Sequence, residues 1–188
     1  MIPSLEAIRA IHRHRQQSLV VATMTGLEEW DSVSVDRSLD LPLIGCMGKA
    51  SSVGLGLALA QPERRVMVID GDGSLLMNLG SLATIANKEP KNYFHFVMQD
   101  GGYTTSDSQP LPAADKLSFS LMAKAAGYRA AYEFDDLEEF VTQVEDILQQ
   151  EGPVLISLKV EHGEIPPSVP RTLQDAVEEL RVILSRPS

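Results

Sequence analysis

The chain has 188 residues, of which 44% are hydrophobic and 22% are charged, and its formal net charge at pH 7 is -10. This length and composition suit one globular domain with a buried core and exclude a disordered binding segment. The acidic charge argues against nucleic acid or an anionic membrane as a partner, and the single cysteine, Cys46, excludes an iron–sulfur cluster held by a set of cysteines.

The first third of the chain is predicted to hold one amphipathic helix and two short strands. Ser4 is expected to cap a helix that ends near Arg15, and a buried strand follows at residues 19–24. A polar stretch then extends to Asp40, before a second strand at residues 41–44 and a helix rich in small residues at 48–60. No segment is long and apolar enough for a signal peptide or a membrane span, so a cytoplasmic location without membrane attachment is expected.

The rest of the chain alternates between strand and helix patterns. Gly101 to Asp115 is a loop without apolar periodicity, and a loop of this length is usually either functional or disordered. Residues 161–170 are predicted to be irregular, and Thr172 is expected to cap the last helix. The other predicted strands are 65–70, 93–98, 129–134 and 154–160, and the other helices are 75–87, 119–126, 137–150 and 172–184. This alternation predicts the α/β class, with a doubly wound parallel sheet in a single domain spanning residues 1–188.

Two of these strands end in acidic residues that indicate a ligand site. Val66 to Asp70 is followed by Gly71-Asp72-Gly73-Ser74, and Phe94 to Gln99 is followed by Asp100-Gly101-Gly102-Tyr103. Ligands of open parallel sheets bind at the carboxyl ends of the strands. Glycines let backbone N–H groups approach a phosphate, and carboxylates beside a phosphate need a cation such as Mg²⁺ between them. The pattern therefore predicts a magnesium–diphosphate site.

These motifs resemble the metal–diphosphate motif of the thiamine diphosphate enzymes. The segment from Leu43 to Ala58 is similar to the part of that family that contacts the aminopyrimidine of the cofactor. Gln99 to Tyr103, followed by Ser108-Gln109-Pro110, most resembles the sulfopyruvate and phosphonopyruvate decarboxylases. The resemblance covers about residues 4–160. It implies the thiamine diphosphate-binding fold, with thiamine diphosphate and Mg²⁺ as cofactors.

The resemblance also implies a role for individual residues. Asp72, Asp100 and the backbone carbonyl of Gly102 would bind the metal, although relatives usually have asparagine at the position of Asp100. Met47 would bend the cofactor so that its two rings approach each other, and the Gly45 carbonyl would accept a hydrogen bond from the pyrimidine. The complete set implied to bind the cofactor is Thr25, Gly26, Gly45, Cys46, Met47, Gly71, Asp72, Gly73, Ser74, Asp100, Gly102 and Tyr103.

One catalytic group of the family has no counterpart in this sequence. Thiamine chemistry needs a glutamate against the pyrimidine, and in the family it comes from a separate pyrimidine-binding domain. No catalytic residue is therefore assigned here, and the activating glutamate is expected on a partner subunit of alpha type. The resemblance implies a beta-type subunit of a heteromeric 2-oxo acid decarboxylase that also associates with itself. Its small anionic substrate would be sulfopyruvate, or else phosphonopyruvate.

Two further interpretations remain open from the sequence. The chain could be a non-catalytic or regulatory diphosphate-binding module, an interpretation that the Asp100 substitution favours. Within the catalytic class it could instead belong to an acetolactate synthase-like or an oxidative 2-oxo acid enzyme. His162, in the loop after the last strand, is a weak candidate for contact with substrate or partner.

Overall fold

The computed structural model describes residues 1–104, 109–169 and 171–185 of the chain. Ser108, part of the predicted loop and of the Ser-Gln-Pro motif, lies outside the described residues. Among those described, seven strands form one sheet in the order β1-β9-β5-β4-β2-β3, with β8 paired to β9, and all of its pairs are parallel. The strands are β1 (Ile2–Pro3), β2 (Leu19–Thr23), β3 (Asp40–Leu43), β4 (Val66–Gly71), β5 (Tyr93–Gln99), β8 (Ala130–Phe134) and β9 (Val154–Glu161). The predicted α/β class with a parallel sheet is confirmed.

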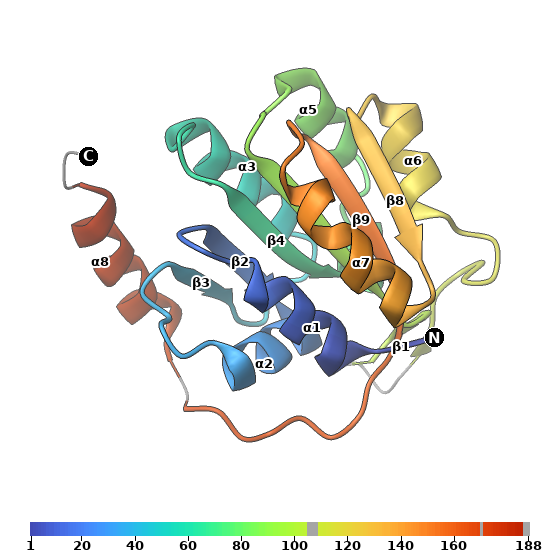
Figure 1. Cartoon of the computed structure of the whole chain (residues 1–188), viewed down its shortest axis with the longest axis horizontal. Coiled ribbons are helices and arrows are strands. Elements are labelled where there is room, and N and C mark those ends of the chain that lie inside the picture. The colour runs from blue at the N-terminus through green and yellow to red at the C-terminus, as the bar shows by residue number, and fades with distance from the viewer. Residues whose placement is uncertain (105–108, 170, 186–188) are drawn as a thin grey trace.

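Helices cover both faces of the sheet (Figure 1). One core lies between the sheet and α1 (Ser4–Arg13), α2 (Met24–Val33) and α7 (Leu137–Leu148). The other core lies under α3 (Ala50–Ala60), α4 (Asp72–Leu76), α5 (Ser81–Lys88), α6 (Phe119–Ala126) and α8 (Leu173–Leu184). Because side chains alternate along a strand, Met67 and Ile69 of β4 enter the first core and Val68 enters the second. Both faces of β4 are thus buried, which explains its uninterrupted apolar sequence.

Helix α2 corrects the prediction of a polar stretch between the first two strands. Its buried residues include Leu27 and Trp30, but also Glu29, which is completely buried. The apolar stripe is narrow because this glutamate occupies part of it, so the helical period was hidden in the sequence. The carboxylate is tolerated in the interior because Ser4 and His162 contact it.

Two further predictions about local structure were wrong, and a third was incomplete. Ser4 does not cap α1, because its hydroxyl donates instead to Glu29, 2.6 Å away. The predicted helix at 75–87 is interrupted between α4 and α5, where Asn78 donates to the Gly48 carbonyl at 2.8 Å. The loop after β5 contains a two-stranded antiparallel ribbon, formed by β6 (Gly102–Tyr103) and β7 (Gln109–Pro110).

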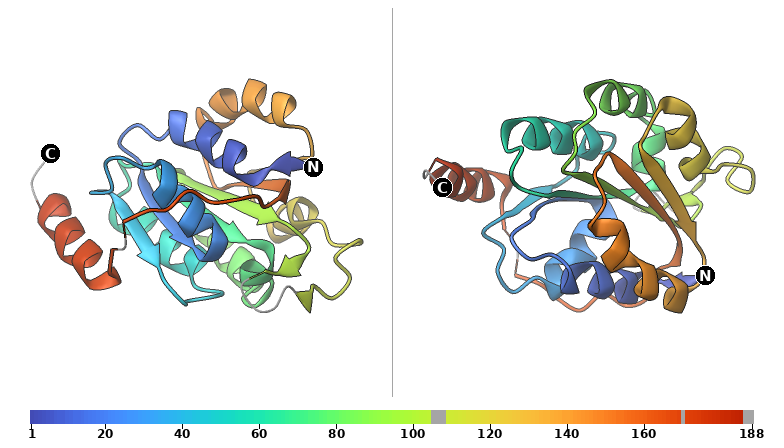
Figure 2. Two further views of the ribbon diagram at one scale, coloured as in Figure 1. Left: turned by 90° about the horizontal axis from the view of Figure 1, so that it is seen from below. Right: turned by 45° about the horizontal axis from the view of Figure 1, so that its top comes forward.

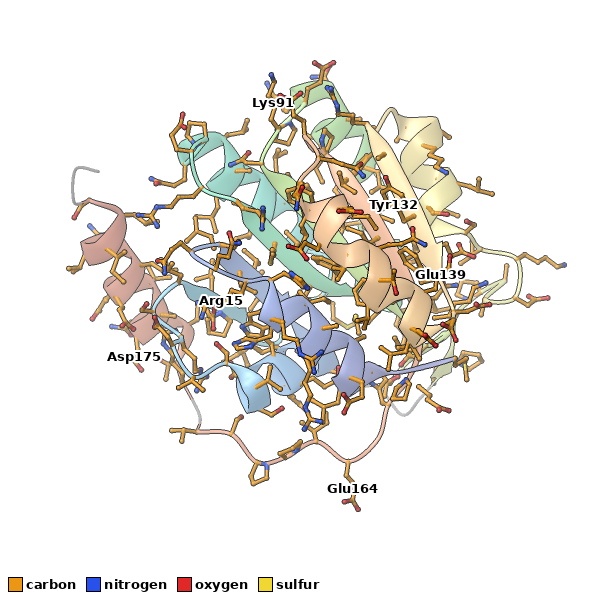
Figure 3. The ribbon with its side chains drawn as sticks, viewed as in Figure 1. Arg15, Lys91, Tyr132, Glu139, Glu164 and Asp175 are labelled. Carbon is orange, nitrogen blue, oxygen red and sulfur yellow. The ribbon has the colours of Figure 1, made fainter. Side chains whose placement is uncertain are left out.

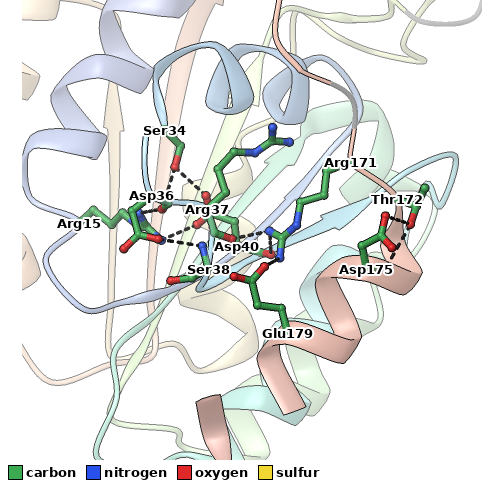
Figure 4. Close-up of polar contacts among 10 residues, drawn as sticks. All are labelled: Arg15, Ser34, Asp36, Arg37, Ser38, Asp40, Arg171, Thr172, Asp175 and Glu179. Carbon is green, nitrogen blue, oxygen red and sulfur yellow. Dashed lines mark hydrogen bonds and ion pairs between the residues drawn. The ribbon is translucent and has the colours of Figure 1, made fainter. Parts of the chain in front are cut away.

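The segment that follows β9 runs along the outside of α2 before α8 begins at the far end of the molecule (Figure 2). We call residues 162–169 the strap. At its end, the Arg171 guanidinium donates to the backbone carbonyls of Arg37 and Asp40 and lies 2.6 Å from Glu179 of α8 (Figure 4). The predicted cap is confirmed, since Thr172 accepts from the Asp175 N–H at 3.1 Å. Among the helices described, none combines the length and the apolar character that crossing a membrane requires.

Candidate diphosphate and metal site

The candidate site lies where β2, β4 and β5 end, at the carboxyl edge of the sheet. These strands are neighbours, and Gly71 of β4 is paired with Met98 of β5, so the loops after both strands begin side by side. A small pocket, partly open to solvent, lies between the loops. Its walls are Met24, Thr25, Gly26, Met47, Gly71, Asp72, Gly73, Ser74, Met98, Asp100, Gly102, Tyr103, Thr104 and His162.

Asp72 is held by the backbone at the floor of this pocket. One carboxylate oxygen accepts from the Gly73 N–H at 2.7 Å, and the other accepts from the Gly101 N–H at 2.8 Å. Burial raises the pKa of Asp72, and the nearby Asp100 raises it further, although the two backbone donors act in the opposite direction. An anion that is destabilised in this way favours a cation beside it.

Asp100 faces the same pocket but has different partners. Its Oδ1 accepts from the Gly102 N–H at 3.0 Å, and its Oδ2 contacts the Thr104 hydroxyl and lies 3.3 Å from Nε2 of His162. Burial raises the pKa of this carboxyl, but the contacts with His162, Thr104 and Gly102 outweigh burial, and the pKa is lowered. Asp100 is therefore the carboxylate of the two that its surroundings stabilise in the charged form.

His162 joins Asp100 to a buried glutamate, a connection that the sequence did not reveal. Its Nδ1 lies 2.9 Å from Oε1 of Glu29, whose other oxygen accepts from Ser4. Burial lowers the pKa of His162, but its hydrogen bonds to Asp100 and Glu29 outweigh burial and raise the pKa to about 9. His162 was a weak candidate in the sequence. Glu29, in the predicted polar stretch, gave no sign of a role at the site, because its partner His162 lies 133 positions away.

The segment before α3 is fixed to the loop after β4. Gly48 has a φ of +74°, its N–H donates to the Ser74 hydroxyl at 2.9 Å, and its carbonyl accepts from Asn78. These contacts hold the segment so that Met47 forms part of the pocket wall. Ser74 therefore positions the backbone of the neighbouring segment as well as lining the pocket.

Ten of the twelve predicted cofactor-binding residues line the one pocket, and Gly45 and Cys46 do not. Gly45 lines a neighbouring groove, which shares Met24 with the pocket and also contains Leu27 and Ile44. Cys46 contacts the Ile44 carbonyl through its sulfur, at 3.3 Å. Met24, Met98, Thr104 and His162 are pocket residues that the sequence analysis did not assign.

The two glycines that flank Asp72 differ in how closely they are packed. A Cβ atom at this position would lie 2.7 Å from the Tyr103 ring, so only glycine permits this approach. A Cβ at Gly71 would meet nothing within 4 Å, which leaves the backbone open to a ligand. In the described part of the chain, no cluster of three His, Cys, Asp or Glu side chains is arranged to hold a metal. A cation here would rely on Asp72, Asp100 and backbone oxygen, which suits Mg²⁺.

Comparisons with known proteins identify the family. Residues 23–158 match the model of the thiamine pyrophosphate enzyme C-terminal TPP binding domain. The chain is 37% identical over 164 residues to the sulfopyruvate decarboxylase subunit beta of Methanothermobacter thermautotrophicus, covering 87% of this chain and 84% of that protein. It is 34% identical to the corresponding subunit of Methanocaldococcus jannaschii, covering 88% of this chain and 91% of that one.

Other relatives are longer. The phosphonopyruvate decarboxylase of Streptomyces hygroscopicus is 38% identical over 130 residues, which are 69% of this chain and 32% of that protein. A solved structure of a thiamin diphosphate-dependent enzyme from Mycobacterium smegmatis has a TM-score of 0.72 at 18% identity and covers 85% of this chain. The chain spans about a third of each of these two proteins. The structural match confirms the predicted fold, and the family match shows that the chain belongs to the thiamine pyrophosphate enzymes, as a C-terminal TPP-binding domain.

Proposed function

We propose that the chain is the beta-type subunit of a heteromeric thiamine diphosphate-dependent 2-oxo acid decarboxylase. The observation that carries this proposal is the pocket at the ends of β2, β4 and β5, which combines Asp72, Asp100, a glycine-lined backbone and Met47. The names of the relatives support it, because the proteins from Methanothermobacter and Methanocaldococcus are beta subunits of sulfopyruvate decarboxylase. Residues 1–188 would form the diphosphate-binding domain of the complex.

In this proposal the two carboxylates and one carbonyl hold Mg²⁺. Asp72 and Asp100 line the pocket, and the Gly102 carbonyl lies near Gly73, because a Cβ on Gly73 would be 3.4 Å from that oxygen. Three oxygen ligands leave room around the ion for diphosphate oxygens and water. The backbone between Gly71 and Ser74 lines the same pocket, and its Gly73 N–H is already donated to Asp72.

Met47 is placed to act on the other end of the cofactor. It lines the pocket, while Gly45 lines the adjoining groove, and Met24 belongs to both. A cofactor that extends from the pocket into the groove would pass the Met47 side chain, which can hold it in a bent shape. When bound, thiamine diphosphate supplies the electron sink that stabilises the carbanion left by departing CO₂. Met47 would hold the cofactor in a shape in which the activating proton transfer is effectively intramolecular.

The carboxylate that activates the pyrimidine would come from an alpha-type partner subunit. Glu29 is a buried glutamate that contacts His162 of the pocket wall, but both of its oxygens are engaged, by His162 and Ser4. It lies behind His162 and does not line the pocket. A second copy of this chain would present the same surface, so a pyrimidine-binding subunit is needed. Self-association through other surfaces is compatible with such a complex.

Sulfopyruvate is the proposed substrate, and phosphonopyruvate is the next candidate. The deciding experiment is to purify the chain with its pyrimidine-binding partner and to measure CO₂ release from sulfopyruvate, phosphonopyruvate and pyruvate. We expect activity with one of the first two, dependent on Mg²⁺ and thiamine diphosphate. The chain alone should be inactive. Decarboxylation by the purified single chain, or a complex that releases no CO₂ from any 2-oxo acid, would refute the proposal. The cytoplasmic location stays a prediction from the sequence.

A further inference from the structure

His162 lies where two carboxylates converge, at the start of the strap. Parallel pairing of β1 with β9 matches Pro3 with Glu161, and this register brings His162 next to Ser4. Ser4 holds one oxygen of Glu29 at 2.6 Å, and the other oxygen of Glu29 lies 2.9 Å from Nδ1 of His162. The imidazole orientation is therefore fixed from behind by a completely buried group.

The opposite ring nitrogen faces the pocket. Nε2 of His162 lies 3.3 Å from Oδ2 of Asp100, and only 15% of the His162 side chain is exposed. A carboxylate oxygen can only accept hydrogen bonds, so each ring nitrogen of His162 is placed to donate to one of the two acids.

We infer that His162 is a positioning residue for Asp100, which it contacts through one ring nitrogen while Glu29 holds the other. This inference rests on the proposed function of the pocket. The contact of His162 with Oδ2 of Asp100 keeps Oδ1 directed at the Gly102 N–H.

The side chain at position 162 can be changed so that its two contacts are lost one at a time. In His162→Asn, the amide nitrogen can replace Nδ1 and still donate to Glu29, but it does not reach Asp100. In His162→Gln, the amide nitrogen can replace Nε2 and still donate to Asp100, but the contact with Glu29 is lost. Glu164→Gln is the matched control, because Glu164 is an exposed acid of the same strap whose side chain points away from the molecule (Figure 3).

The test is a double-mutant cycle between positions 162 and 100 in the complex with the pyrimidine-binding subunit. Calorimetry measures the affinity for thiamine diphosphate at saturating Mg²⁺. We expect His162→Asn to weaken binding about tenfold when residue 100 is aspartate, which corresponds to about 1.4 kcal/mol. When residue 100 is asparagine, the same change should weaken binding less than about threefold, since a neutral amide makes a weaker hydrogen bond with His162 than a carboxylate does. Glu164→Gln should stay near wild type, and His162→Gln should weaken binding less than His162→Asn does, because it keeps a donor to Asp100.

Two readouts separate this inference from the function on which it rests. Unfolding of the full chain in urea, without cofactor, should show the same coupling between positions 162 and 100 if the two side chains interact. Asp72→Ala, measured in the same calorimetric series, tests the proposed metal site. If Asp72→Ala leaves cofactor affinity unchanged, the proposed function fails. If Asp72→Ala weakens binding but the cycle shows no coupling, or His162→Asn strengthens binding, the role of His162 alone is overturned.

Discussion

Asparagine should be tolerated at position 100 but not at position 72, although both residues are aspartates of one pocket. At position 72 two backbone donors, from Gly73 and Gly101, are bound by different carboxylate oxygens. Asparagine has one acceptor oxygen, so in either orientation its NH₂ group faces one of these N–H groups. An unsatisfied buried donor costs about 1–3 kcal/mol, part of which is offset because the buried carboxylate is itself unfavourable.

At position 100 the hydrogen bonds suit an amide. Oδ1 accepts from the Gly102 N–H, and asparagine retains this acceptor. The atom in place of Oδ2 would be NH₂, which can donate to the Thr104 hydroxyl and to Nε2 of His162. His162 can accept there when its other nitrogen donates to Glu29. Asp100→Asn therefore leaves no polar group without a partner.

The matched pair of variants is measured in the complex, by calorimetric titration with thiamine diphosphate at fixed Mg²⁺. Asp72→Asn should weaken binding by at least about 100-fold, corresponding to about 2.7 kcal/mol. The metal loses a charged ligand, and the amide NH₂ group faces one of the two backbone N–H donors. Asp100→Asn should change binding by less than about threefold. Thermal unfolding serves as the folding control, with Asp72→Asn lowering the midpoint by roughly 2–4 °C per kcal/mol of net destabilisation. Equal losses in both variants, or unchanged binding in Asp72→Asn, would refute this reasoning.

Three other predictions concern the cofactor, the C-terminal helix and pH. Met47→Ala should lower turnover more than cofactor affinity, because the side chain shapes the cofactor while the diphosphate end supplies much of the binding. Equal turnover in the variant and the wild type would mean that Met47 serves only in packing. Arg171→Ala should weaken the attachment of α8 by about 1.5–3 kcal/mol, since two backbone carbonyls and Glu179 lose a charged donor. Amide hydrogen exchange should then become faster in α8 while it stays slow in β4. Burial, and then Arg15, lower the pKa of His12 from 6.5, so the unfolded chain binds more protons and stability should fall as pH falls below about 6.5. His12→Gln should reduce this loss in urea titrations at pH 5 to 7, and an unchanged pH profile would contradict the assignment.

Much of the fold and part of the site followed from local sequence patterns. The apolar run of β4 ends in Gly71 and Asp72, that of β5 ends in Asp100, and in a parallel sheet both ends lie at one edge. Strand period, turn residues and strand ends are properties of neighbouring positions, so the sequence alone indicated where Asp72 and Asp100 would meet. The small residues around Gly48 likewise indicated a closely packed segment, which the contact with Ser74 explains.

The contacts behind the pocket were decided by the tertiary structure. Helix α2 was hidden because Glu29 interrupts its apolar stripe, and that acid is acceptable only because Ser4 and His162 reach it from other elements. Ser4 lies 25 positions and His162 lies 133 positions from Glu29 in the sequence. Their meeting depends on the pairing of β1, a strand of two residues, with β9. No local sequence pattern predicts such a contact, because it forms only when folding pairs the first strand of the chain, β1, with β9.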